Sequence, residues 1–195
     1  MHAILMTAVL AVVPTNMELA EDALEAALQG LAEHLEALEV DRVYVEMEGE
    51  HPGNWFVRQT VLSVLREGGI GVVDGESRPD SVPVLRVRPM EIRVEYGNVG
   101  RSWVIGTKKV DRIAECELMF TLLDRDGAVL DNLRTGGRRN DRVSWSEAET
   151  AKGSGEWDWL SEDLPEDVGG GILEPVVVTG IVASLIYLFY SSRAE

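Results

Sequence analysis

Four charged side chains in the middle of the chain are the strongest candidates for binding chemistry. Arg86, Arg88 and Glu95 lie in a stretch where charged and apolar residues alternate, and Arg101 follows it. Alternation with a period of two places such side chains on one face of a β-strand. The default interpretation is that such charges pair with charges on neighbouring strands and bind nothing. The other interpretation is that these four residues form a ligand or partner surface.

The sequence offers little for catalysis or metal binding. Glu46, Glu48, Glu50 and His51 cluster in "EMEGEH" and could hold a cation. With one imidazole and no second ligand cluster, a solvated loop is the better interpretation. No serine or cysteine stands in a nucleophile motif with a histidine in a suitable order. We therefore expect no catalytic residue, no metal and no cofactor, and a protein that is not an enzyme.

Charge and cysteine content restrict the partners. The chain has a net charge of −16, which argues against nucleic acid because phosphate binding needs a basic surface. The acids gather before residue 51 and after residue 145, and they are predicted to be solvated; an acidic face for a basic partner is the alternative. Cys116 is the only cysteine, so no internal disulfide can form. Its apolar neighbours at every second position predict that it is buried.

The first half of the chain alternates between helical and strand periods. Leucines spaced four and three apart predict an amphipathic helix over 18–38. The pattern then predicts a strand at 42–47, a helix at 55–67 and a buried strand at 70–74. The domain is thus expected to begin with the order α, β, α, β.

The second half has the period of β-structure. Strand patterns cover about 84–96 and 110–123, and a change of phase after Pro89 predicts a bulge or bend. "GNVG" at 97–100 and "GGRRND" at 136–141 predict turns. The predicted fold class is α+β, an α/β sandwich in which about two helices pack on a mixed, mostly antiparallel sheet.

The C-terminal segment is the most apolar part of the chain. Residues 172–190 carry one charge, Glu174, and as a helix they would span about 28 Å, close to the thickness of a bilayer core. They are predicted to form one C-terminal transmembrane helix; a core helix is the alternative. Gly180, Ala183 and Ser184 have the small-residue spacing of a helix–helix contact, which would permit a homodimer.

An apolar run near the N-terminus allows a membrane topology to be predicted. It resembles the core of a signal peptide and, with the C-terminal span, predicts an extracytoplasmic domain. Trp157 and Trp159, in the connector before the span, could pack on the domain or reach the membrane interface. The expected parts are a signal peptide or apolar N-terminal segment (1–17), an extracytoplasmic α/β domain (18–152), an acidic linker (153–171), the transmembrane helix (172–190) and a short cytoplasmic tail (191–195).

The order of these elements resembles a known group of bacterial domains. A strand, a loop and a helix ending at "REGGIGVVD" lead to a long strand pair closing on "RIAECELMFTLLDRDGAVL". Over about residues 40–135 this is similar to extracytoplasmic α/β domains of the curli secretion channel protein, the flagellar outer-membrane lipoprotein and the lipoprotein activators of penicillin-binding proteins. Those proteins carry a lipidated cysteine just after the signal, whereas Cys116 lies in mid-domain here. The predicted span therefore favours a bacterial inner membrane, with the domain in the periplasm.

These inferences predict a non-enzymatic, membrane-anchored module. It would contact the lipid bilayer through residues 172–190 and would bind or assemble protein partners of the cell envelope. One alternative is a small-ligand sensor or an enzyme with a site built from scattered arginine and glutamate residues. Another is a tail-anchored protein whose domain lies in the cytosol.

Overall fold

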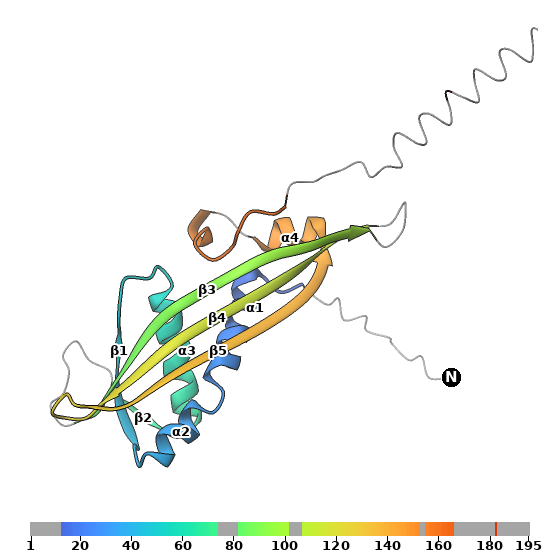
Figure 1. Cartoon of the computed structure of the whole chain (residues 1–195). Coiled ribbons are helices and arrows are strands. Elements are labelled where there is room, and N and C mark those ends of the chain that lie inside the picture. The colour runs from blue at the N-terminus through green and yellow to red at the C-terminus, as the bar shows by residue number, and fades with distance from the viewer. Residues whose placement is uncertain (1–12, 74–81, 102–106, 153–154, 166–181, 183–195) are drawn as a thin grey trace, which may run out of the picture. The chain divides into compact units, whose positions relative to one another are not determined.

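The computed structural model (Figure 1) describes residues 13–73, 82–101, 107–152 and 155–165, together with residue 182. The chain divides into two compact units, 1–164 and 165–195, and the account below concerns the first. Among the described residues, no helix is long and apolar enough to cross a membrane. The predicted span at 172–190 lies outside the described residues except for Val182, and so do Gly180, Ala183, Ser184, residues 1–12 of the predicted signal peptide and the predicted tail.

A five-stranded sheet organises this unit. In spatial order the strands are β2 (Gly71–Val73), β1 (Arg42–Met47), β3 (Val84–Arg101), β4 (Lys108–Leu123) and β5 (Val129–Ser144). β1 runs parallel to both of its neighbours, β2 and β3, while β3, β4 and β5 form an antiparallel meander. The predicted mixed and mostly antiparallel sheet is thereby confirmed.

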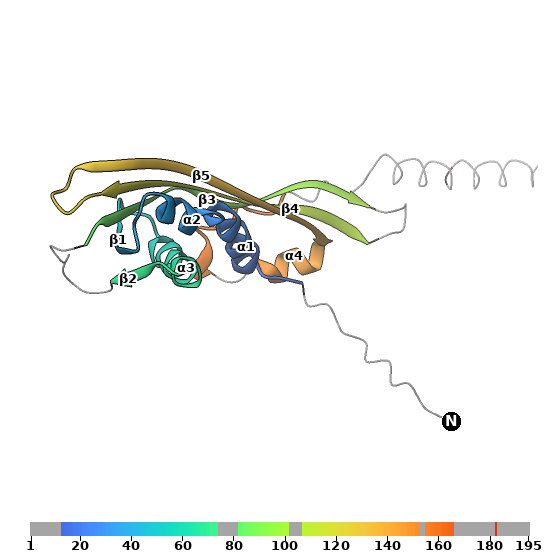
Figure 2. The ribbon, with the colours of Figure 1, turned by 90° about the horizontal axis from the view of Figure 1, so that it is seen from below.

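The helices lie together on one face of the sheet (Figure 2). About two were expected, and the described residues contain four: α1 (Asn16–Leu28), α2 (Leu31–Ala37), α3 (Asn54–Glu67) and α4 (Trp145–Ala151). The predicted helix over 18–38 is broken because Gly30 adopts the left-handed conformation, with φ +84°. Ser144 starts α4 with a reciprocal capping box to Glu147.

The core lies between this helical layer and the sheet. Alternate residues of β3 and β4 enter it, and the leucines of α1 and α3 meet them. Cys116 is buried as predicted, with 2% of its surface exposed, and its thiol lies 3.6 Å from the Ala20 carbonyl oxygen. The phase change at Pro89 is a register shift between Pro89 and Glu91, which confirms the predicted bulge.

Two predicted turns are wrong, because both segments belong to long strands. Residues 97–100 stay in β3 with a local register shift, and Asn98 has a φ of +44° there. Residues 136–141 continue β5 without interruption. A Cβ atom on Gly137 would stand 1.9 Å from the Ala23 carbonyl oxygen of α1. This glycine lets the helix lie directly on the strand, and it therefore serves packing instead of a turn.

A buried ion pair ties the meander together on its helical side. Arg112 is fully buried although it is charged. On β4 it points inward, as do Val110 and Ala114 on either side of it in the alternating pattern. Its guanidinium donates two hydrogen bonds to Asp141 of β5, the Nε bond measuring 2.9 Å, and a third of 3.1 Å to the Asn16 side chain. Together these bonds join α1, β4 and β5, since Asn16 belongs to the first helix.

The segment after α4 also packs on the domain. We call residues 155–164 the strap. The Leu160 carbonyl accepts a 2.7 Å hydrogen bond from the Val94 amide of β3, and Leu160 is buried. The Trp159 ring packs edge-on against His51, with ring centroids 5.5 Å apart, and Trp157 lies 5.5 Å from Trp55. Both tryptophans therefore pack back on the domain.

Replacing Trp159 with alanine should release the strap. Trp159 is partly buried against the core, so its removal should cost about 2 kcal/mol of local stability. The Val94 amide, bonded to the strap through Leu160, should then exchange with deuterium about thirtyfold faster. Hydrogen–deuterium exchange followed by mass spectrometry measures this rate. The exposed neighbour Asp158, changed to alanine, is the control, and equal exchange in both variants would disprove the strap's dependence on the indole.

Burial makes the single thiol inert. It raises the pKa of Cys116 from 9.0 to about 12, so the native thiol should not react with iodoacetamide at pH 8, whereas the urea-unfolded chain should react at once. A raised pKa in the folded state gives stability that is complete below pH 9 and is lost towards pH 12. Urea unfolding between pH 8 and pH 11 should show this decline. A Cys116→Ala variant should lose stability less steeply with pH; an equal slope would contradict the assignment.

Candidate functional site

The best candidate for a functional surface is the sheet face opposite the four described helices, which all lie on the other side (Figure 2). We call the outer side of β3, β4 and β5, from Arg86 onward, the open face (Figure 2). β3 contributes charges of both signs, β4 contributes acids, and β5 contributes arginines spaced four residues apart. The charged side chains of the open face are Arg86, Arg88, Glu91, Arg93, Glu95, Asp111, Glu115, Glu117, Arg134, Arg138 and Arg142.

The predicted site residues share this face but do not converge. Arg86 forms an ion pair with Glu46 of β1 at 2.7 Å. Glu46, one of the acids in "EMEGEH", is therefore paired with an arginine. Arg88 is exposed, and Glu95 contacts Arg93 at 3.0 Å. Arg86 and Glu95 stand about 30 Å apart along one strand. The backbone of Arg101 ends β3, and its side chain lies outside the described residues. A role for these four residues as a partner surface stays a prediction.

The centre of the open face is built around a residue that was not predicted as a site residue. Arg93 reaches Glu91 at 2.7 Å, Glu95 at 3.0 Å and Glu115 at 2.8 Å. The bonds to these carboxylates raise the pKa of Arg93, with the Glu115 hydrogen bond as the main cause. Cross-strand pairing of this kind stabilises the sheet.

Arginines of β5 form the outer rim of the open face. Arg134 donates to Glu117, and Arg138 lies 3.3 Å from Glu115. The Arg134 bond lowers the pKa of Glu117. The two arginine side chains remain 66% and 63% exposed. A guanidinium has five N–H donors, so each arginine keeps donors that a partner can use.

A depression opens on this face where β5 has a glycine. It has a volume of about 270 Å³ and lies over Gly136, beside Arg138. The surrounding groups are Glu91, Glu115, Cys116, Glu117, Gly137 and Arg138. In the register of the sheet, Gly136 stands opposite Glu117, which in turn stands opposite Glu91. This depression is shallow and open, as a docking site for a protruding side chain would be.

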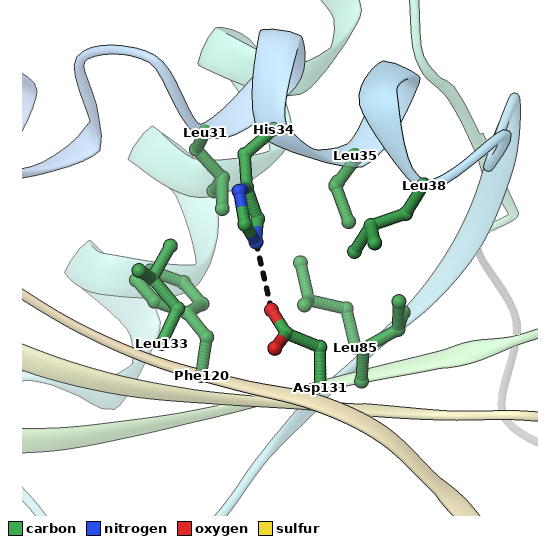
Figure 3. Close-up of a pocket in the computed structure, with 9 residues that line it drawn as sticks. Leu31, His34, Leu35, Leu38, Leu85, Phe120, Asp131 and Leu133 are labelled. Atoms are coloured by element: carbon green, nitrogen blue, oxygen red, sulfur yellow. Dashed lines mark hydrogen bonds and ion pairs between the residues drawn. The ribbon is translucent and has the colours of Figure 1, made fainter.

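The helical side carries a small cavity at the other end of the sheet. Figure 3 shows His34 of α2 pointing to Asp131 of β5 across it, with Nε2 and Oδ2 2.7 Å apart. This hydrogen bond lowers the pKa of Asp131. Leucines and Phe120 line the rest. The volume is about 10 Å³, room for one water molecule, so this pair links a helix to the sheet edge instead of forming a ligand site.

Metal ligands do not gather anywhere in the part of the chain that the structure describes. No group of three or more histidine, cysteine, aspartate or glutamate side chains there has the geometry to hold an ion. Glu48 and Glu50 stand beside the turn that precedes α3, and the His51 ring accepts a 3.0 Å hydrogen bond from the Gly53 amide. Burial lowers the pKa of His51. This imidazole is thus committed to the local turn and to Trp159.

Comparison with known proteins finds similarity of fold alone. No family model and no curated protein matches the sequence. A minor lipoprotein from Acinetobacter baumannii is similar in structure, with a TM-score of 0.37, 16% identity and coverage of 57% of this chain and 77% of that one. A homologue of a neuraminyllactose-binding hemagglutinin from Helicobacter pylori has a TM-score of 0.35, 14% identity, and coverage of 53% and 66%. The rare lipoprotein B from Shewanella oneidensis has a TM-score of 0.31, 15% identity, and coverage of 56% and 87%.

Two of these three neighbours are bacterial lipoproteins. At these TM-scores the likeness carries no further argument. The specific likeness to the curli, flagellar and penicillin-binding-protein activator families stays a prediction. The fold and the open face together define an α+β module with one helical face and one uncovered, charged sheet face.

Proposed function

We propose that this chain is a non-enzymatic module, anchored at a bacterial inner membrane, that binds a protein partner of the cell envelope through its open face. The observation that carries the proposal is the open face itself. Three long strands display paired charges that none of the described helices covers, and most of the carboxylates and guanidiniums there are already engaged. A broad polar surface with a shallow depression suits a protein surface better than a small substrate.

The predicted topology places this surface outside the cytoplasm. The apolar segments at both ends support that orientation, which remains part of the proposal. A fluorescent reporter fused after Glu195 should be active in the cytoplasm, while protease added to spheroplasts should remove the domain. A domain that resists protease until the cells are lysed would contradict this orientation.

Site-specific crosslinking in the membrane tests the binding surface. A photo-crosslinking amino acid at position 88, on the open face, should give a discrete adduct with an envelope protein. The same residue at position 25, an exposed site on α1, is the matched control and should give none. Adducts from position 25 alone, or from neither position, would disprove binding through the open face. A small-ligand sensor would instead leave both positions uncrosslinked.

A further inference from the structure

Two adjacent glycines in the middle of β5 have different surroundings. Gly137 faces α1, where a side chain would collide with the helix backbone. Gly136 faces the open side, where an added Cβ would meet nothing closer than the Cys116 carbonyl oxygen at 3.6 Å. That distance is an ordinary contact, and Gly136 does not have the positive φ that favours glycine elsewhere in the chain. Packing and backbone conformation therefore leave Gly136 unexplained.

Glycine at such a position has a cost. In a strand interior it destabilises the fold by about 0.5–1 kcal/mol relative to alanine. A strand glycine without a conformational reason often marks a place where another chain or a ligand approaches closely. Here it creates the depression of about 270 Å³ on the open face. The open side of Gly136 therefore has room for a side chain of a binding partner.

β5 also has a free backbone edge among the described residues. It is the last strand of the sheet and, among the described residues, pairs with β4 alone. Its outer N–H and C=O groups are therefore available to a further strand. The strand is 16 residues long, and Val129 and Leu130 at its start are more than half exposed. This combination is a template for the addition of an extended segment.

The charges beside this edge select the segment. Every second residue of β5 lies next to an added strand on the open side. In order along the strand these are Arg134, Gly136, Arg138, Asn140 and Arg142. Although the whole chain is strongly acidic, these direct neighbours are basic and keep spare donors, with side chains 66%, 63% and 54% exposed for the three arginines. A second β5 would bring arginines against arginines, whereas carboxylates two residues apart from a central side chain would meet Arg134 and Arg138.

The geometry points to an extended acidic segment of the partner protein that adds to the edge of β5 and places an aromatic side chain over Gly136. Large aromatic side chains cover edge glycines in sheets, and here the ring would lie between two guanidiniums, an arrangement favoured by cation–π contact. Glutamate or aspartate two residues to either side would bond Arg134 and Arg138. This inference rests on the proposed function and specifies the partner's chemistry.

A synthetic peptide tests this recognition directly. The probe is a short threonine-based peptide with a central tryptophan and a glutamate two residues to either side. It is titrated into the full-length protein in detergent micelles at physiological salt, and binding is followed by fluorescence anisotropy. We expect saturable binding that weakens at least about tenfold when the tryptophan becomes alanine or the glutamates become lysine. Equal or tighter binding of the lysine peptide would overturn the inference.

Variants of the protein locate the site. Gly136→Val fills the depression and should weaken binding at least about tenfold, whereas Asn140→Val, on the same face of the same strand, should not. Thermal unfolding of both variants checks that the fold is kept. Arg138→Glu should lose the glutamate peptide and gain the lysine peptide, which supplies a second test if Gly136→Val does not fold. Unchanged binding in Arg138→Glu would overturn the inference, as would a protein that forms dimers through β5 in solution.

The crosslink from position 88 separates this inference from the proposed function. If Gly136→Val abolishes an adduct that the unaltered chain forms, both are supported. If the adduct persists in Gly136→Val, the partner binds the open face without using β5, and this inference fails while the proposed function stands. If the unaltered chain gives no adduct, the proposed function fails. The inference then fails with it, because it describes how that partner binds.

Discussion

A single methyl group at Gly137 should unfold much of this protein. The Cβ of alanine would stand 1.9 Å from the Ala23 carbonyl oxygen and 2.5 Å from the Ala27 amide nitrogen. Both are backbone atoms of α1, so the clash can be relieved only by moving the whole helix away from the sheet. Such overpacking costs about 3 kcal/mol or more. Gly137→Ala should therefore lose at least that much stability in urea unfolding followed by circular dichroism, or should fail to fold.

Gly136→Ala is the matched control for this prediction. It adds the same methyl group one residue away, on the opposite face of the same strand, with its nearest contact at 3.6 Å. Removing a glycine from a strand interior should leave stability within about 1 kcal/mol of the parent, with a small gain favoured. Similar losses in the two variants would show that α1 does not lie on β5 as described.

Neutralising Asp141 should cost almost as much. Asp141→Asn leaves the Arg112 guanidinium fully buried without its counter-charge, and an uncompensated buried charge costs about 3 kcal/mol or more. The loss should appear in urea unfolding at neutral pH. A double variant, Arg112→Met with Asp141→Leu, should recover most of it, because an apolar pair removes both buried charges.

Asp111→Asn gives the comparison that isolates burial. Asp111 and Asp141 are equally exposed, at 25%, and each pairs with an arginine. The partner of Asp111 is Arg142, which is 54% exposed and 3.4 Å away. Pairs in solvent contribute less than about 1 kcal/mol, so this variant should be nearly neutral. Equal effects at positions 111 and 141 would contradict the burial of Arg112.

What the sequence predicts well here is local. The period of two in β4 places Cys116 in the core, and the change of phase at Pro89 marks the bulge. Arg112 stands in phase with the buried residues of β4, so its inward position could have been read from the same pattern. Its partner Asp141 could not, because that pairing depends on the register of two strands.

The glycine pair shows the limit of local patterns. "GG" followed by polar residues is typical of a turn, but Gly137 is required by a helix more than a hundred residues earlier in the chain. The predicted site had the same weakness. Arg86, Arg88 and Glu95 do lie on the uncovered face, yet the depression on that face surrounds Gly136, a residue without a functional group. Only the register of β3, β4 and β5 brings its lining together.

The strap sets the length of the tether. With residues 155–164 packed on the domain, the predicted linker keeps only residues 165–171 before the predicted span. Fully extended, that stretch reaches about 25 Å, against about 65 Å for the whole of 153–171. If the proposed anchoring at the inner membrane holds, so short a linker restricts the open face to partners at or near the same bilayer. A domain on a short tether stays within a thin layer beside the membrane. The effective concentration of a partner held in the same layer rises as the layer becomes thinner.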